Sequence, residues 1–235
     1  MYRGLIHFHS KYSHDSILSI KAIVDFAISE NLNFLILTDH ETLEGSKKLK
    51  EYVEKNNYAI EVLIAAEYNT EYGDIIALDI KKEIKDIRFQ QFIFSVKEQN
   101  GYILFPHPYK GHKNINTIAK HADLIEIFNS RVDEENNLKS EILAKKYSKN
   151  IYYASDAHNR RSLRNAIIEF KKEGTLIESM FNSEINLVVS DKTLLYEIHL
   201  SQIIKAIKQK RINLFIRIML SSVKNLFLLN LFKKV

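Results

Sequence analysis

The chain of 235 residues contains no cysteine, only 2 prolines and only 6 glycines. Without cysteine it can form no disulfide and offer no thiolate to a metal, which fits a reducing cytoplasm. The scarcity of proline and glycine argues against a flexible linker. No uncharged apolar stretch reaches the roughly 18 residues that a membrane-spanning helix needs. The apolar run in "MYRGLIHFHS" is too short for a signal peptide. We therefore expect a cytoplasmic protein.

Charge is distributed unevenly along the chain. Residues 1–191 carry 25 basic and 28 acidic side chains, whereas the remainder carries nine basic residues and only Glu197 as an acid. The acidic excess of the body makes nucleic-acid binding possible but not favoured. With 46% hydrophobic and 27% charged residues, the composition is that of a globular protein. We predict one large domain over residues 1–190 and a basic, apolar helical extension over residues 191–235.

Short apolar runs alternate with amphipathic stretches along the body. The segment "SIKAIVDFAISEN" (19–31) spaces its apolar residues as a helix does, and further helices are expected near 44–56, 88–100 and 133–149. The apolar runs predict buried strands at residues 5–8, 34–38, 60–67, 74–80, 102–106, 124–128 and 151–155. Strands of this kind separated by helices indicate an α/β fold with a parallel sheet covered on both faces. About seven such units favour a closed TIM-like barrel, with a doubly wound open sheet as the alternative.

Polar residues stand at or just beyond the ends of these strands. They are His7 and His9, Asp39 and His40, Glu67, His107, Glu126 and Asn129, and Asp156 and His158. The carboxyl ends of the strands in a parallel barrel share one face, so these side chains are expected to converge there. Residues i and i+2 of a strand point the same way, so His7 and His9 could reach the same ion. Glu67 follows a wholly apolar strand, where a carboxylate is costly unless it is paired or bound to metal.

Taken one at a time, some of these residues have a simpler explanation. Asp39 could cap the helix that follows it, and His107, between two prolines in "LFPHPY", could be an ordinary loop histidine. The expected convergence of several strand ends makes a metal site the better interpretation. Nitrogen and oxygen ligands without sulfur suit zinc, manganese or iron, and magnesium is possible.

The polar motifs also resemble those of a known family. The segments "HFHSKYSHDS", "LTDHETLEG", "AAEYNT", "FPHPY", "IEIFNSR" and "ASDAH" are similar, in type, order and spacing, to the successive motifs of the PHP (polymerase and histidinol phosphatase) superfamily. The resemblance covers about residues 5 to 170. The closing Asp-x-His separates the pattern from the amidohydrolases, which share the initial His-x-His but finish with a single aspartate. The resemblance implies a distorted barrel of about seven parallel strands that holds two or three divalent metal ions.

The resemblance further implies which residues bind each ion. The ligands of the first ion would be His7, His9, Glu67 and Asp156. Glu67 would bridge to a second ion with the help of His107, while His40 and His158 would hold a third.

Two positions depart from the commonest family pattern. The chain reads Ser13-His14-Asp15-Ser16 where many members read Ser-Asp-Gly, so either His14 or Asp15 completes the third ligand set. Asp15 is favoured, because members with this spacing place an aspartate there. Asp74, in "YGDIIAL", is the expected ligand of the second ion at a position where many members carry histidine and others glutamate.

Clustered divalent ions predict the hydrolysis of a phosphate ester by metal-bound hydroxide, because such ions activate water and neutralise phosphoryl charge. Asp39 or His158 could assist proton transfer, although Asp39 could equally orient a ligating histidine. Arg131, in "FNSR", is the first candidate for a phosphate clamp, with a surface arginine as the alternative. Lys110 is a weaker candidate. No glycine-rich phosphate loop is present.

The favoured substrate is a phosphate monoester of a small metabolite or nucleotide. A phosphodiesterase or nuclease acting on short nucleic acids and a protein-phosphotyrosine phosphatase are alternatives that the resemblance leaves open. A non-catalytic metal-binding domain is the alternative that involves no reaction.

The C-terminal segment has helical spacing over residues 190–210 and a very apolar continuation over 211–235, which is interrupted by Arg217 and Lys224. We expect a terminal helix packed on the barrel or on a second subunit. The alternative is an amphipathic helix lying on an anionic membrane surface.

Overall fold

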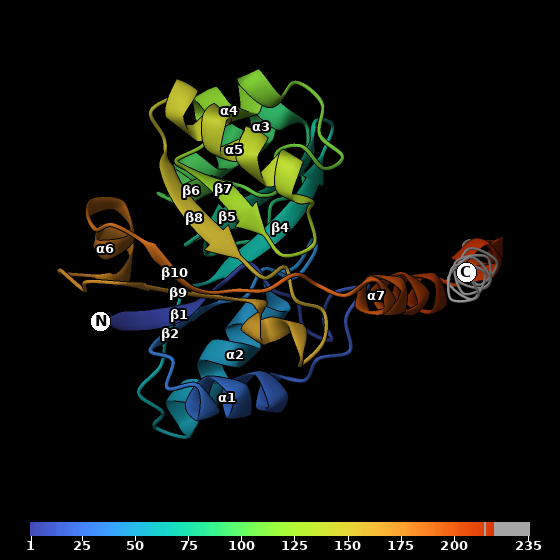
Figure 1. The fold of residues 1–235 in the computed structure, drawn as a ribbon, viewed down its shortest axis with the longest axis horizontal. Helices are drawn as coiled ribbons and strands as arrows, with labels where there is room; N and C mark the ends of the chain where they lie inside the picture. The colour runs from blue at the N-terminus through green and yellow to red at the C-terminus, as the bar shows by residue number, and fades with distance from the viewer. Residues whose placement is uncertain (214, 219–235) are drawn as a thin grey trace, which may run out of the picture.

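The computed structural model describes residues 1–213 and 215–218 of the chain (Figure 1). Most of the apolar segment 211–235 therefore lies outside the described residues, and self-association and membrane contact through it stay predictions. Within the described part, no helix is both long and apolar enough to cross a membrane. The last helix with assigned bounds is α7 (Leu195–Lys208), which lies inside the helical stretch that the sequence predicts for residues 190–210.

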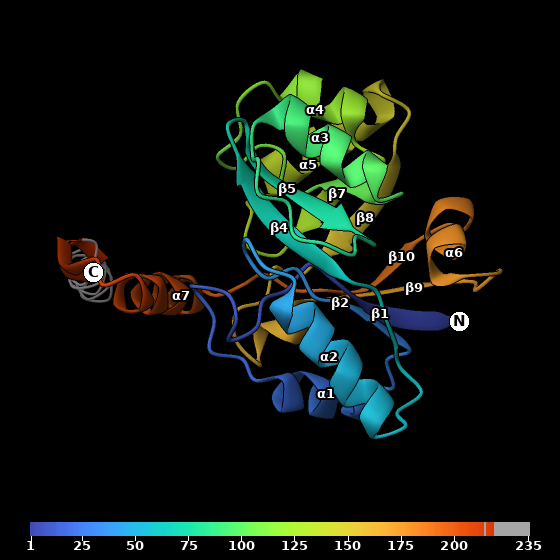
Figure 2. The same ribbon diagram turned by 180° about the vertical axis from the view of Figure 1, so that it is seen from behind.

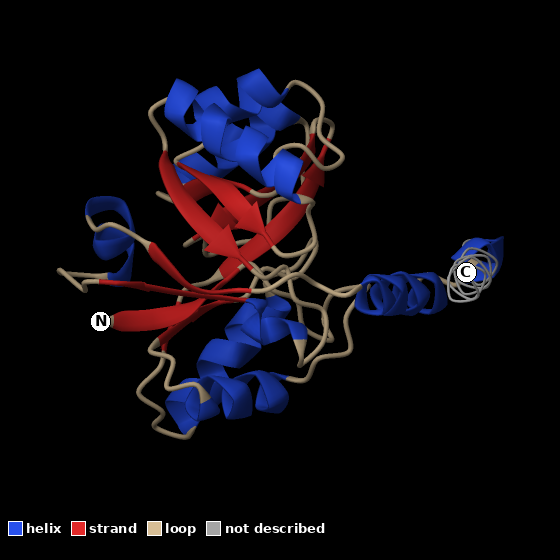
Figure 3. Ribbon diagram, viewed as in Figure 1, coloured by secondary structure: helices blue, strands red, loops and turns tan. Residues whose placement is uncertain are grey.

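The strands of the described residues form two five-stranded sheets (Figure 3). The strand order is β10-β9-β1-β2-β3 in the first sheet and β4-β5-β6-β7-β8 in the second. One strand in each sheet, β9 in the first and β5 in the second, runs opposite to the other four. The bounds are β1 Tyr2–Ile6, β2 Phe34–Ile36, β3 Glu61–Val62, β4 Ala65–Thr70, β5 Gly73–Leu78, β6 Tyr102–Phe105, β7 Leu124–Asn129, β8 Asn150–Ala154, β9 Ala166–Phe170 and β10 Asn186–Ser190.

Helices cover the outer face of each sheet, and the inner faces share one core (Figures 1 and 2). The first sheet packs on α1 and α2, and the second on α3, α4 and α5. The bounds are α1 Ile20–Ser29, α2 Glu44–Lys55, α3 Phe89–Glu98, α4 Ile115–His121 and α5 Glu134–Lys146. The helices predicted at 19–31, 44–56, 88–100 and 133–149 are thus confirmed. Between the sheets, Phe34 and Phe170 of the first pack in one cluster with Leu104 and Tyr152 of the second.

The two sheets are linked by isolated bridges, three of whose four residues follow strands β1, β2 and β8, while Glu67 lies within β4. Single parallel bridges join Phe8 to Ala157 and His40 to Glu67. The α/β class is confirmed, but the closed TIM-like barrel of about seven parallel strands is not found among the described residues, which form two mixed sheets instead. A strand that is buried on both faces has the same continuous apolar composition whether its neighbour is parallel or antiparallel, so composition alone could not reveal strand direction.

The reversed strand of the second sheet comes from a hairpin. Only Glu71 and Tyr72 connect β4 to β5, and a two-residue connection returns the chain antiparallel. Gly73, directly after the turn, has a φ of +118°, a backbone conformation that residues with a side chain rarely adopt. The predicted strand at 74–80 is present as β5, while the predicted strand at 60–67 is divided into β3 and β4.

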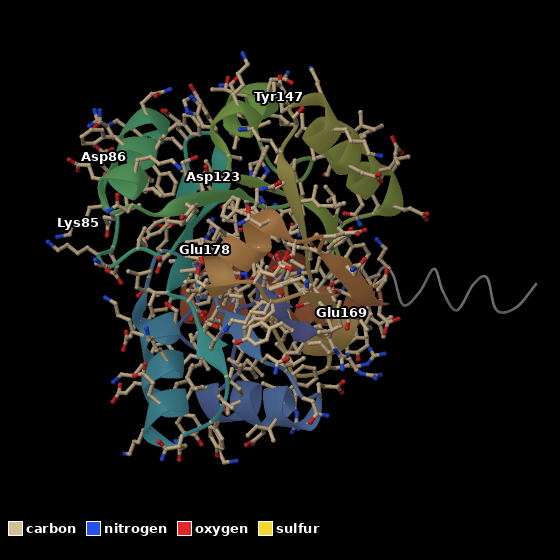
Figure 4. The ribbon with its side chains drawn as sticks, turned by 90° about the vertical axis from the view of Figure 1, so that its left-hand side faces the viewer. Lys85, Asp86, Asp123, Tyr147, Glu169 and Glu178 are labelled. Atoms are coloured by element: carbon tan, nitrogen blue, oxygen red, sulfur yellow. The ribbon has the colours of Figure 1, made fainter. Side chains whose placement is uncertain are left out.

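Helices α6 (Leu176–Asn182) and α7 lie at opposite ends of the molecule (Figures 1 and 2). Leu176 and Met180 of α6 are part of the core between the sheets, near the start of β1. Figure 4 looks from that end and shows Glu178 of α6 over the middle of the molecule. α6 therefore covers one end of the inner core, and the carboxyl ends of β1 and β2 lie toward the other end, beside α7.

Gly4, in the middle of β1, pairs with Phe34 on one side and Ile168 on the other. A Cβ atom at this position would lie 2.4 Å from the carbonyl oxygen of Phe34 and 2.5 Å from its Cδ1. We expect Gly4→Ala to lower the free energy of unfolding by about 1–3 kcal/mol, because the strands must move apart to admit the methyl group. Urea denaturation measures the change, with Lys50→Ala on an exposed position of α2 as the control. Equal midpoints for the two variants would contradict the expectation.

Candidate metal centre

Three clusters of histidine and carboxylate groups lie where the two sheets meet. Within each cluster, one potential ligand atom from every member lies within 4.8 Å of the others. The clusters are His9, Asp15, His40 and His158; His7, His9 and Asp156; and His7, Glu67 and His107. His7 and His9 each belong to two clusters, so the three form one continuous site. The bridges between the sheets involve members of this site or their neighbours, so the contacts that join the sheets also bring the ligands together.

Glu67 lies at the centre of the site and is 1% exposed. Its Oε2 lies 3.4 Å from Nε2 of His7, 3.4 Å from Nε2 of His9 and 3.4 Å from Nδ1 of His40. Its Oε1 lies 3.3 Å from Nε2 of His107. A carboxylate that contacts several imidazoles in this way can serve more than one cluster, as a bridging ligand does.

Asp15 joins the site from the loop that follows β1. Its Oδ2 lies 3.2 Å from Nε2 of His40 and 3.1 Å from Nε2 of His158. His14, the other candidate from this segment, lies outside the three clusters and stacks on His40, with ring centroids 4.6 Å apart. The loop therefore directs Asp15, rather than His14, at the third ligand set.

Several polar atoms of the site are buried and have no hydrogen-bond partner among the described residues. They are Nε2 of His7, Nδ1 and Nε2 of His9, Nδ1 of His107, and Oε1 and Oε2 of Glu67. An unpaired buried polar atom costs about 1–3 kcal/mol, so native structures nearly always give such atoms a partner. Imidazole nitrogens and carboxylate oxygens without sulfur suit zinc, manganese, iron or magnesium. The residues therefore fit divalent cations.

Burial and neighbouring charges shift the pKa values of the site residues in different directions. Burial, together with the nearby His158 and His40, lowers the pKa of His9 to about 3, which keeps its ring in the neutral form that binds metals. Burial also disfavours the charged form of His40, but Glu67 and Asp15 outweigh it and raise the pKa of His40 to about 9. Burial would raise the pKa values of Glu67 and Asp15, yet the facing imidazoles hold both well below their usual range. The carboxylates are therefore ionised, and a bound cation would displace protons from the imidazoles that face them.

Three residues of the site have a left-handed backbone, which is uncommon outside glycine. The φ angle is +59° at His7, +28° at His107 and +48° at Asp156. Because β1 ends at Ile6, the prediction that His7 and His9 share a face within a strand is wrong, although their rings still converge. Such conformations cost about 1–3 kcal/mol each and cluster at functional sites.

Glu126, in β7, holds two of the histidines in place through hydrogen bonds to the His7 ring and the His107 backbone. Its Oε1 accepts a hydrogen bond from Nδ1 of His7 at 2.8 Å, which leaves Nε2 of His7 facing Glu67. Its Oε2 accepts hydrogen bonds from the backbone nitrogen of His107 at 2.6 Å and from Nδ2 of Asn129 at 2.9 Å. Both oxygens are thus used in positioning ligands. Glu126 was expected at a strand end without a role, although an acid in an apolar strand is the same signal that identifies Glu67.

Asp39 is buried beside the site but belongs to none of the three clusters. Its Oδ1 accepts from the backbone nitrogen of Ser10 and its Oδ2 from the hydroxyl of Ser10, both at 2.6 Å. The Asp39 carboxylate can lie here only because residue 45 is glycine, since a Cβ atom on Gly45 would lie 1.8 Å from Oδ2 of Asp39. Burial raises the pKa of Asp39 to about 6. Asp39 therefore fixes the residue that follows His9, and it does not cap α2, which has no side-chain cap.

Asp74, the predicted ligand of the second ion, is not brought to any of the three clusters. It pairs across the hairpin with Asn69, whose Nδ2 donates to Oδ1 of Asp74 at 2.6 Å. The cross-strand partner of Glu67 is Ile76, so Asp74 lies two residues farther along the hairpin. Asp74 and Glu67 are therefore diagonal neighbours on the same face of the hairpin, and the ligand role of Asp74 stays a prediction.

Two cations border the site at Asp156. Nη1 of Arg131 lies 3.6 Å from Oδ1 of Asp156, and Nζ of Lys110 lies 3.6 Å from Oδ2. Burial would raise the pKa of Asp156, but these two cations hold it well below its usual range. Nη1 of Arg131 also lies 3.0 Å from Nε2 of His158, and the Arg131 side chain is only 7% exposed. The alternative of a surface arginine is therefore wrong.

Comparison with known proteins adds a family and several relatives. A family model described as PHP domain matches residues 6–214, a range that extends past the predicted boundary at residue 190 and includes α7. Two uncharacterised proteins of Methanocaldococcus jannaschii are related in sequence. The first is 32% identical over 115 residues, which cover 44% of this chain and 66% of that protein, just under two thirds of its length. The second is 28% identical over 179 residues, 71% of this chain and 70% of that protein.

Two solved structures have a similar fold. One is a two-domain protein from Bacteroides vulgatus, described as containing a predicted PHP-like metal-dependent phosphoesterase, with a TM-score of 0.67 and 17% identity. It aligns over 80% of this chain and 65% of that chain. The other is PsfC from Pseudomonas syringae, with a TM-score of 0.62 and 15% identity, which aligns over 89% of this chain and 99% of that chain. At these identities the similarity is one of fold.

We expect Glu126→Gln to weaken the binding of divalent ions by about 10- to 100-fold, because it alters the acceptor that fixes His7 and His107. The measurement is the content of manganese or zinc per chain after dialysis against graded concentrations of the ion. Glu98→Gln, at an exposed position of α3, makes the same chemical change away from the site and is the control. Equal affinities in the two variants would show that Glu126 does not position the ligands.

Proposed function

The chain belongs to the PHP domain family, and from this premise we propose that it is a metal-dependent phosphoesterase that hydrolyses a phosphate monoester of a small metabolite or nucleotide. The observation that carries the proposal is the convergence of three buried ligand clusters beside two cations, Arg131 and Lys110. Both would assist the hydrolysis of a phosphate ester, since divalent ions and cationic side chains stabilise charge on the phosphoryl oxygens. The description of the Bacteroides vulgatus neighbour as PHP-like agrees with this proposal.

The proposed ligands of two or three divalent ions are the members of the three clusters. They are His7, His9, Asp15, His40, Glu67, His107, Asp156 and His158. Asp74, which belongs to none of the three clusters, is not part of this set. Zinc, manganese or iron would suit this donor set best, with magnesium also possible. When bound, such ions lower the pKa of a coordinated water and neutralise negative charge on the phosphate.

The remaining residues are assigned by what their polar atoms contact. Nε2 of His158 lies 3.1 Å from Oδ2 of Asp15, and both residues belong to the first cluster, which supports a ligand role for His158 over proton transfer. Both oxygens of Asp39 hold Ser10, which supports a positioning role for Asp39. Arg131 would bind phosphate oxygens through its planar guanidinium, with Lys110 as a second contact.

We expect the purified chain to release phosphate from at least one member of a panel of phosphomonoesters, and only with an added divalent ion. The monoesters are sugar phosphates, nucleotides and a phosphotyrosine peptide, and short oligonucleotides are added to the panel as phosphodiesters. Manganese, zinc, iron and magnesium are added in turn. His9→Ala removes a residue shared by two clusters and should reduce release at least a hundredfold, a loss within the range that metal-site residues contribute to catalysis. His121→Ala, at an exposed position beside the Phe89 ring, is the matched control.

The panel also separates the alternatives. Cleavage of oligonucleotides without release from monoesters would replace the proposal with a nuclease, and release from the phosphotyrosine peptide alone would replace it with a protein phosphatase. A chain that binds metal but hydrolyses nothing in the panel would favour the non-catalytic alternative.

Arg131→Lys should raise the KM for the best monoester by roughly 10- to 100-fold while leaving the metal content unchanged, because an ammonium cannot form the paired hydrogen bonds of a guanidinium. Steady-state kinetics and metal analysis of the same preparation provide both measurements. Arg88→Lys, at an arginine that pairs with Asp86 on the surface, is the control. An unchanged KM would remove Arg131 from the substrate site.

A further inference from the structure

One face of α7 is packed against the body of the protein. Glu197, Ser201, Ile204 and Lys208 are spaced four, three and four residues apart, so they lie on the same side of the helix. The exposed fraction is 3% for Glu197, 1% for Ser201 and 8% for Ile204, whereas Lys208, at the end of the helix, is exposed and reaches the body through Nζ. Figure 1 shows α7 at the end of the molecule opposite α6, which is the end toward which the first strand runs. The packed face is therefore placed next to the metal site.

Ser201 contacts the proposed phosphate-binding arginine. The Ser201 hydroxyl accepts a hydrogen bond from Nη2 of Arg131 at 2.8 Å. Nη1 of the same guanidinium faces Asp156 and His158. With one nitrogen fixed by α7, the guanidinium plane is held at the edge of the ligand clusters.

Lys208, two helical turns farther along, contacts the loop that carries Asp15. Its Nζ donates to the backbone oxygens of Lys11, Ser13 and Ser16, at 2.8, 2.7 and 2.7 Å. An ammonium has three donors, and here all three are used on one loop. The three carbonyl groups lie on both sides of Asp15 in the sequence, so the loop is curled around Nζ.

The same loop reaches the site through its hydroxyl groups. Ser13 donates to Oδ1 of Asp15 at 2.8 Å, and Ser16 donates to the backbone oxygens of His9 and His158, both at 3.0 Å. A change in the loop would therefore move Asp15 relative to the histidines that it faces. Lys208 holds the loop from outside, and the serines transmit its position to the ligands.

We infer that α7 is a positioning element of the metal site, in which Lys208 sets the loop that presents Asp15 and Ser201 sets the guanidinium of Arg131. This inference rests on the proposed function, because it assigns α7 to the metal and phosphate sites proposed above. Helix α7, which was expected to belong to a separate extension over residues 191–235, is on this inference part of the site. Lys208 and Ser201 act through other residues and contact neither reacting atoms nor ions.

The first test compares Lys208→Met with Lys210→Met in the full chain. Methionine keeps the length and apolar stem of lysine but removes the ammonium, and Lys210 is an exposed lysine two residues away on the same segment. Hydrogen exchange follows the loop amides, among them those of Lys11 and Ser13, which donate to Leu18 and Ser10. We expect exchange over residues 10–18 to accelerate by roughly tenfold or more in Lys208→Met and to stay unchanged in Lys210→Met.

The second test measures manganese binding to the same two variants and to Asp15→Asn. We expect Lys208→Met to lower the affinity for one manganese ion by about tenfold, and this should be the ion whose affinity Asp15→Asn also lowers. The other ions should bind as they do in the wild type. Faster loop exchange with metal binding equal to that of Lys210→Met would overturn the inference, because α7 would then hold the loop without setting a ligand. Equal exchange in the two variants would overturn it as well.

The third test concerns Ser201. Ser201→Ala should raise the KM for the substrate several-fold with kcat and metal content unchanged, since only the guanidinium is released. A change in metal content in this variant would contradict the assignment. A wild-type chain that binds no divalent ion would contradict both the proposed function and this inference. A wild-type chain that binds metal and is active, together with Lys208→Met and Ser201→Ala variants whose exchange, metal binding and kinetics equal those of Lys210→Met, would contradict the inference alone.

Discussion

The burial of the Glu67 carboxylate among four imidazoles is the interaction on which the rest of the structure depends. Its two oxygens lie 3.3 to 3.4 Å from nitrogens of His7, His9, His40 and His107, and they lack hydrogen-bond partners among the described residues. An ionised carboxylate in such a position needs compensating positive charge, which either the imidazoles or bound cations must supply. The two sheets meet at this point, and the bridge between residues 40 and 67 is part of the contact.

Around this centre, a set of residues fixes the ligands without belonging to the clusters. Glu126 orients His7 and the backbone of His107, Asp39 fixes the residue after His9, and α7 reaches both the Asp15 loop and Arg131. Left-handed backbone at several ligands adds strain that these supports must overcome. The clusters are thus held from the strands, from the loops and from α7, which lies within the range that the family model matches.

Much of the fold could be predicted from the sequence. The main helices followed from apolar spacing, because a helix buries one face and its period of 3.6 residues is visible in the chain. Strand direction was not visible, because β5 is reversed by a two-residue turn and yet is as apolar as a parallel strand. The strands β9 and β10 were not among the predicted strands at all. For the same reason the closed barrel was expected where two mixed sheets are found, since closure depends on pairing between distant strands, which composition does not specify.

By itself the sequence determined the chemistry of the site: residues with nitrogen and oxygen donors, no sulfur, and motifs of one family in their order. The candidate ligands at positions 7, 9, 40, 67, 107, 156 and 158 could be named because they stand at the ends of apolar runs and match the motifs of the family that the chain resembles. Only the tertiary structure decided that Asp15 and not His14 belongs to a cluster, that Asp74 pairs with Asn69 across a hairpin, and that Lys208 contacts the Asp15 loop from a distant helix. These outcomes depend on register, backbone conformation and contacts between segments remote in the chain, and such quantities are set by packing rather than by local residue type.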